Sequence, residues 1–200
     1  MIKEEPGQVG FGRALKDYFK GYVEFLGRST RAGYWWVQLV LDAIFVVLFG
    51  WLIARLVAGF TADPGFRWQS LIWPLGLLIV LTLATLLPSL ALKVRRFRDV
   101  GIRGRGVAVL LLVQYALACG NAADSYSTTF RHLALLSRQT NVSVATHSSV
   151  GVIIQTLSVA LSLFMFVVTV LPTDTMLTTS HNSFWRFFLR EQPAPQTTED

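Results

Sequence analysis

The chain has 200 residues, of which 52% are hydrophobic and 15% are charged, whereas a soluble domain has about 25% charged residues. This composition, together with fourteen Phe and six Trp, excludes an ordinary soluble domain and indicates a membrane protein. The single Cys119 excludes an internal disulfide framework and belongs to no CxxC redox or metal motif. A net charge of +6 is compatible with a nucleic acid or an anionic membrane surface as partner. The position of the basic residues along the chain decides between these two partners.

Residues 1–33 are predicted to be a cytoplasmic segment that contains one amphipathic helix. In "FGRALKDYFKGYVEFLG", aromatic and aliphatic residues recur at helical spacing and charged residues fall elsewhere on the helix. Such a helix would lie in the membrane interface with its aromatic side in lipid, and the alternative is packing on a soluble partner. No signal peptide is expected, because the first apolar run is too long for one.

Four apolar stretches within residues 34–171 are predicted to cross the membrane, because about 20 helical residues span its hydrocarbon layer. The expected spans are residues 35–57, 71–92, 107–123 and 150–171. The third is only marginally long enough, so a re-entrant segment is the alternative. Residues 124–149 are expected to be an external loop, and 172–200 a cytoplasmic tail that is disordered after about residue 191. The predicted fold is all-α, a polytopic membrane helix bundle of about four transmembrane helices plus an N-terminal interfacial amphipathic helix.

The basic residues predict the orientation. Six of the eighteen Lys and Arg residues lie in residues 93–106, six in the first 33 residues, and two in the C-terminal tail. Only three or four lie on the other side, so the positive-inside rule puts both termini and the basic loop 93–106 in the cytoplasm. Nucleic acid is not an expected partner, because this short loop is tethered to the bilayer at both ends and has no folded reading module.

Two motifs carry a resemblance to a known family. They are "FLGRSTRAGYWW" at 25–36 and "LLPSLALKVRRFRDVG" at 86–101, with a loose echo in "HNSFW" at 181–185. The chain resembles the DUF805 family of small bacterial inner-membrane proteins, which implies a membrane location and no particular reaction. The matching residues are Phe25, Gly27, Arg28, Arg31, Tyr34, Trp35, Pro88, Ala91, Arg95, Arg96, Asp99 and Gly101.

The chain also departs from the family pattern. Phe97 and Arg98 stand where the family usually has Leu-His, and the following Ser-Gly-Trp is replaced by Arg-Gly-Arg at 103–105. Residues 124–149 look inserted. A role that depends on the family's His therefore does not carry over to this chain.

The basic loop is predicted to divide into two groups. Arg95, Arg96 and Asp99 are expected to be structural, with Asp99 paired to Arg28 or Arg31 of the first motif. The candidates for contact with anionic lipid are Arg98, Arg103 and Arg105, because clusters of this kind attract headgroups at about 1 kcal/mol per residue.

A polar layer is predicted inside the membrane. Asp42 lies seven residues past Trp35, roughly 10 Å deep at 1.5 Å per residue, and a charge in a span is a functional candidate by default. Thr85 and Gln114 fall at the same depth, with Ser162 nearby. Hydrogen bonds between helices are one interpretation, and an ion or proton path is the other.

No nucleophile, phosphate-binding or metalloprotease motif is present, and the three histidines lack metal-ligand spacing. The leading hypothesis is therefore a non-enzymatic membrane scaffold that binds anionic lipid, a membrane protein or a second copy, with no cofactor or metal. The alternative is a small transporter or channel that uses the polar layer around Asp42.

Overall fold

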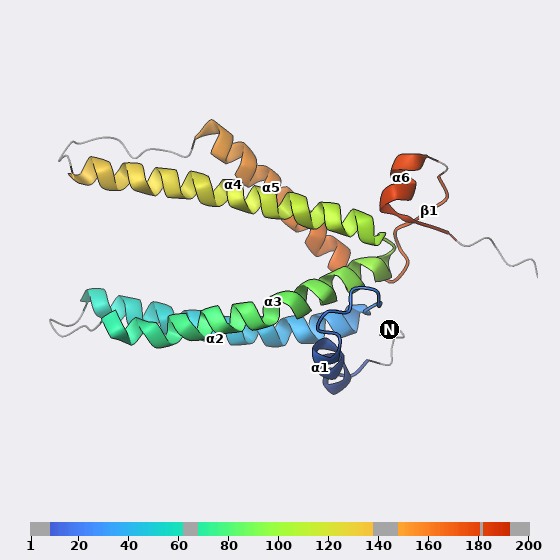
Figure 1. The fold of residues 1–200 in the computed structure, drawn as a ribbon, viewed down its shortest axis with the longest axis horizontal. Helices are drawn as coiled ribbons and strands as arrows, with labels where there is room; N and C mark the ends of the chain where they lie inside the picture. The colour runs from blue at the N-terminus through green and yellow to red at the C-terminus, as the bar shows by residue number, and fades with distance from the viewer. Residues whose placement is uncertain (1–8, 62–67, 138–147, 181, 193–200) are drawn as a thin grey trace, which may run out of the picture. The chain divides into compact units, whose positions relative to one another are not determined.

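The computed structural model describes residues 9–61, 68–137, 148–180 and 182–192, and these ranges are almost entirely helical. The chain divides into two compact units. Unit 1 contains Met1–Gly101 and Pro172–Thr175, and unit 2 contains Ile102–Leu171 and Met176–Asp200. Each unit is described by itself below (Figure 1).

Four long helices confirm the predicted all-α membrane fold. They are α2 (Arg31–Thr61), α3 (Ile72–Val100), α4 (Gly104–Ser137) and α5 (Ser149–Val170). All four are long and apolar enough to cross a membrane. Most of their large apolar side chains are exposed, which is the arrangement expected of helix surfaces that face lipid.

The helices extend beyond the predicted spans. The basic residues 93–100 form the last two turns of α3 instead of a loop, and only the short stretch 101–103 connects α3 to α4. Gly101 ends α3 with a φ of 121°, which L side chains rarely adopt, and its N–H donates to the Phe97 carbonyl.

Helix α4 also differs from the prediction. It is one unbroken helix of 34 residues, which favours a full span over a re-entrant segment. Residues 124–137, expected as part of the external loop, are therefore helical. Residues 138–147 of that loop and the tail after residue 192 lie outside the described residues.

Unit 1 consists of the α2–α3 pair, the short 3₁₀ helix at Trp68–Leu71, and the N-terminal helix α1 (Phe11–Lys20). Helix α1 lies at one end of the pair, beside the start of α2 (Figure 1). It confirms the predicted N-terminal helix. The core that holds it there is formed by Val9, Ala14, Tyr18, Tyr34, Val37 and Leu92.

Two tyrosines join the N-terminal segment to α3 next to Pro88. Proline has no N–H, so the Ala84 carbonyl one turn earlier loses its intrahelical donor. The Tyr22 hydroxyl donates to this carbonyl at 2.7 Å. The hydroxyl of the buried Tyr18 lies 3.0 Å from Ser89 Oγ, and burial raises the pKa of Tyr18, so this hydroxyl stays protonated. The Tyr22 hydroxyl, from another segment of the chain, thus replaces the N–H donor that Pro88 lacks.

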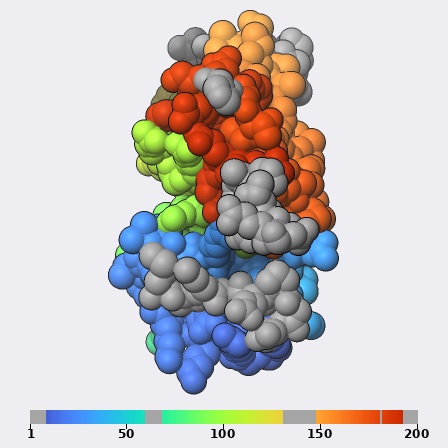
Figure 2. Space-filling view, turned by 90° about the vertical axis from the view of Figure 1, so that its right-hand side faces the viewer, coloured from blue at the N-terminus to red at the C-terminus, as the bar shows by residue number. Residues whose placement is uncertain are grey.

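Unit 2 contains α4 and α5, which cross each other (Figure 1), followed by β1 (Leu177–Thr178), α6 (Ser183–Phe188) and β2 (Arg190–Glu191). The two short strands pair in parallel, with Leu177 opposite Arg190. Figure 2 shows the C-terminal elements in red on the surface of this unit.

Helix α6 packs closely against the start of α4. The Arg103 N–H donates to the Phe188 carbonyl at 2.7 Å. A Cβ at Gly106 would lie 3.0 Å from the Phe188 ring, so the absence of a side chain at Gly106 permits this approach.

We expect Tyr22→Phe to weaken the attachment of the N-terminal segment by about 1 kcal/mol, because the Ala84 carbonyl loses its donor. In a Pro88→Ala background the helix supplies its own N–H, so the same change should cost less. Thermal unfolding in detergent and hydrogen exchange of residues 11–22 measure both effects. Tyr115→Phe, at an exposed tyrosine of α4, is the control. Equal costs in the two backgrounds would contradict this account of Pro88.

Candidate functional site

The first family motif leads into α2 through a capped helix start. Thr30 accepts a hydrogen bond from the Gly33 N–H at 3.2 Å through its side chain, which satisfies one of the free donors of the first turn. The neighbouring Ser29 is fully buried, and its N–H donates to the Arg95 carbonyl at 3.4 Å. This bond joins the first motif directly to the second.

A buried ion pair lies at the end of α3. Arg96 Nη1 is 2.6 Å from Asp99 Oδ2, and the two side chains are 0% and 2% exposed. Thr173, from the segment after α5, donates its hydroxyl to the same carboxylate oxygen at 2.9 Å. The Asp174 N–H donates to the Asp99 carbonyl, also at 2.9 Å. The pair therefore binds the chain after α5 into unit 1.

The predicted partner of Asp99 needs correction. Its salt bridge is formed with Arg96 of its own helix and not with Arg28 or Arg31. Arg28 instead contacts both carboxylate oxygens of Asp174, at 3.4 and 3.5 Å. The i, i+3 spacing puts Arg96 and Asp99 on one face of α3, and Arg28 is already engaged by Asp174.

Other residues of the two motifs line this network. Arg95 is fully buried, and its Nε donates to the Ala91 carbonyl at 3.4 Å. Tyr34 is 5% exposed in the core that holds α1. The buried motif residues also include Gly27, Pro88 and Gly101, whereas Trp35 is half-buried and Phe25 is exposed. Most of the predicted family residues are thus brought together as a structural network.

The three arginines predicted to contact lipid have partners within the chain. Arg98 Nη1 donates to the Phe25 carbonyl at 2.9 Å, which ties α3 to the first motif. Arg103 lies 3.6 Å from Glu191, and the exposed Arg105 guanidinium lies 5.3 Å from the centre of the Phe187 ring. Lipid contact by these residues stays a prediction, and only Arg105 among them is exposed.

Sequence reasoning missed four residues of this network. Ser29 and Thr30 precede α2, and a Ser or Thr before a helix is a known capping signal that could have identified them. Thr173 and Asp174 carry no local signal, because their partners lie more than 70 residues away in the chain.

The predicted polar layer is only partly described by the structure. Asp42 is exposed on α2 and accepts a hydrogen bond from Gln38 at 2.8 Å. The Thr85 hydroxyl donates to the Leu81 carbonyl of its own helix. Gln114 Nε2 donates to Ser162 at 3.1 Å, which confirms that these two residues lie close together in unit 2. A single layer of Asp42, Thr85 and Gln114 stays a prediction.

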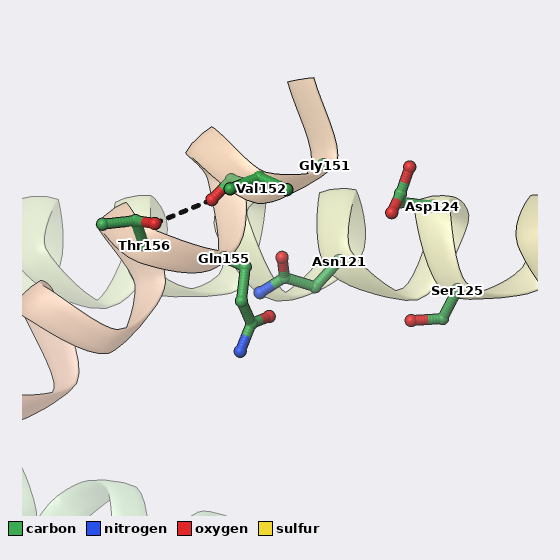
Figure 3. Close-up of a pocket in the computed structure, with 7 residues that line it drawn as sticks. All are labelled: Asn121, Asp124, Ser125, Gly151, Val152, Gln155 and Thr156. Carbon is green, nitrogen blue, oxygen red and sulfur yellow. Dashed lines mark hydrogen bonds between the residues drawn. The ribbon is translucent and has the colours of Figure 1, made fainter. Parts of the chain in front are cut away.

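A pocket of about 430 Å³ lies between α4 and α5. Figure 3 shows its lining residues, which are Asn121, Asp124, Ser125, Gly151, Val152, Gln155 and Thr156. Ser148 donates its hydroxyl to Asp124 at 2.7 Å, and a Cβ at Gly151 would overlap the Asp124 carboxylate. Within the described ranges, no three His, Cys, Asp or Glu side chains are grouped to hold a metal ion.

We expect Asp99→Asn to destabilise the protein by about 3 to 5 kcal/mol, because the Arg96 charge would stay buried without its counter-charge. The matched change Asp174→Asn removes a partly exposed pair and should cost about 1 kcal/mol or less. Thermal unfolding in detergent, followed by size-exclusion chromatography with fluorescence detection, compares the two variants. Equal losses of folded protein would show that the buried pair has no special role.

One family model matches most of the chain. The chain matches the family model described as "Protein of unknown function (DUF805)" over residues 22–175. The match includes both motifs and Pro172–Thr175, whereas α1, α6 and the "HNSFW" echo lie outside it. No curated protein and no solved structure matches the chain. The four apolar helices fit an integral membrane protein, and because the family model covers most of its length, the chain belongs to the DUF805 family of proteins of unknown function.

Proposed function

We propose that this protein is a non-enzymatic scaffold of the bacterial inner membrane that binds anionic lipid headgroups at its cytoplasmic face. The observation that carries the proposal is the arrangement of side chains on α1. This helix is fixed to the end of the α2–α3 pair and still exposes both cationic and aromatic side chains. The distribution of basic residues supports a cytoplasmic location for both termini.

Helix α1 presents three parallel stripes of side chains, two with i, i+4 spacing and one, formed by Phe11 and Phe19, with i, i+8 spacing. Ala14 and Tyr18 are buried and attach the helix to the core of unit 1. Phe11 and Phe19 are 48% and 63% exposed. Lys16 and Lys20 are exposed on a third stripe. A helix with these stripes suits the interface, with its phenylalanines in the acyl region and its lysines among the headgroups.

The attachment of α1 gives these lysines a defined position. A free amphipathic helix can roll or leave the surface, whereas the Tyr22 bond to the Ala84 carbonyl fixes the N-terminal segment to α3. Arg13 faces Asp17 at 3.8 Å, so its charge is partly balanced. Lys16 and Lys20 are therefore the main candidates for attracting an anionic headgroup.

The signature motifs support a structural role for the rest of the unit. Arg96, Asp99 and Arg28 are each held by an ion pair, and Asp99 also accepts the Thr173 hydroxyl. A network of this kind stabilises the fold. Its charged groups are already engaged with one another, so they are less available to bind a ligand. The transporter alternative has less support, because Asp42 is exposed and bonded to Gln38 of its own helix.

We expect Lys16→Gln/Lys20→Gln to reduce the preference for anionic lipid. Two juxtamembrane lysines contribute about 2 kcal/mol, which corresponds to roughly a 30-fold change in relative affinity. The full chain is reconstituted in vesicles that contain brominated phosphatidylglycerol or brominated phosphatidylcholine. The ratio of tryptophan quenching by the two lipids measures the preference, which should also fall as salt is raised.

Arg55→Gln is the matched control, because Arg55 is an exposed cation near the other end of α2. This variant should keep the wild-type ratio. The same preference in the double lysine variant as in the wild type would remove α1 as the lipid-binding element.

The orientation is tested separately. A fluorescent protein fused to the C-terminus should fold and fluoresce, whereas alkaline phosphatase fused at the same point should be inactive because it stays in the cytoplasm. The same pair of fusions after residue 142, in the predicted external loop, should give the reverse pattern. An active phosphatase at the C-terminus would contradict the proposed cytoplasmic face.

A further inference from the structure

A groove of about 330 Å³ lies on the surface of α2 at its first two turns. Its lining residues are Arg31, Ala32, Trp35, Trp36 and Leu39. Arg31, Trp35 and Leu39 follow one another at i, i+4 and i+8, so they form one stripe along the helix. Ala32 and Trp36 form the neighbouring stripe. Ala32 contributes only a methyl group to the lining of the groove.

The two walls of the groove are fixed by packing. Trp35 packs against the core that holds α1. The ring of Trp36 is in edge contact with Phe11 of α1, with 5.8 Å between their centroids. The groove is therefore a preformed feature of the fold, and its floor and sides are almost entirely apolar.

The mouth of the groove carries the positive charge of Arg31. Arg31 is exposed, and no acidic side chain in the part of the chain that the structure describes forms an ion pair with it. The Arg96 guanidinium is near enough for the two positive charges to repel each other. This situation is the opposite of that at Arg28, which belongs to the same motif and is paired with Asp174.

We propose that this groove binds one phospholipid with an anionic headgroup, whose phosphate is held by Arg31 and whose acyl chain lies in the groove. Leu39 is eight residues beyond Arg31, or about 12 Å along the helix at 1.5 Å per residue. The Arg31 charge thus lies at the start of the span, and the apolar end of the groove at Leu39 lies deeper in the membrane. This order matches that of a lipid molecule, whose headgroup lies at the surface and whose acyl chains lie in the interior. Tryptophan rings at the same level suit the boundary between headgroups and acyl chains.

This inference rests on the proposed binding of anionic lipid and adds a specific site to it. Helix α1 would attract headgroups in general through Lys16 and Lys20, whereas the groove would hold a single lipid by charge and shape together. Variants at the two places therefore distinguish the two statements.

The test is native mass spectrometry of the full chain, purified in detergent, stripped of lipid and titrated with dioleoylphosphatidylglycerol. The wild type should bind one lipid much more tightly than any further ones, and dioleoylphosphatidylcholine should bind at least about 10-fold more weakly. Arg31→Gln should weaken the tight binding by a similar factor, and Arg31→Lys should keep most of it. Glycerol phosphate, which has the headgroup charge and no chains, should not compete.

Three further variants complete the design. Arg55→Gln removes a cation from the same helix and should leave the tight binding unchanged. Ala32→Leu keeps the charge, fills the groove and should weaken binding if an acyl chain occupies it. Lys16→Gln/Lys20→Gln should keep the single tight lipid. Each variant is first shown to melt within a few degrees of the wild type.

Several outcomes would overturn the site. Equal binding by Arg31→Gln and wild type would remove Arg31 as the headgroup contact, even if the lysine variant had lost its anionic preference. Competition by glycerol phosphate would indicate a free phosphate site instead of a lipid site. A chain dimer that is lost in Ala32→Leu would mean that a second copy covers the groove. Loss of the tight lipid in the lysine variant alone would assign it to α1.

Discussion

The buried ion pair between Arg96 and Asp99 is the interaction on which unit 1 depends. Two charges removed from water lose several kcal/mol of hydration, so such a pair persists only where further hydrogen bonds satisfy it. Here the hydroxyl of Thr173 supplies one, at 2.9 Å from the carboxylate. The neighbouring Asp174 then holds Arg28 of the first motif. The free-energy cost of burying Arg96 and Asp99 is thus offset by these contacts. They hold together the end of α3, the segment after α5 and the first motif.

The membrane explains why polar contacts are important in this fold. Apolar side chains gain little by leaving lipid for another helix, so packing and hydrogen bonds decide which helix surfaces meet. The Tyr22 bond to the carbonyl next to Pro88 and the bond between Gln114 and Ser162 are examples. In unit 2, Gly151 lets the Asp124 carboxylate approach α5 directly. The bond between Gln114 and Ser162, which both lie within predicted spans, uses polar groups that would otherwise be unsatisfied in hydrocarbon.

The arginines of this chain differ in role according to whether the fold balances their charge. Arg28 and Arg31 are three residues apart in one motif, yet one is paired with a carboxylate and the other is exposed beside a groove. The family match begins at residue 22, after the end of α1. Helix α1 thus lies outside the matched residues, and its Tyr18 hydroxyl contacts Ser89 Oγ of the matched part at 3.0 Å.

The amino-acid sequence by itself determined the membrane character, the four spans, the N-terminal helix and the family, because these depend on apolar run length, helical periodicity and local motifs. It also predicted a structural role for Arg95, Arg96 and Asp99, which are buried, although it assigned Asp99 the wrong partner. Only the tertiary structure decided that Arg96 is that partner, that Thr173 completes the network, and that Arg31 stays exposed. The partner of a charged side chain depends on which segments of the chain lie close together in the fold. When two segments are more than 70 residues apart in sequence, no local sequence pattern predicts their contact.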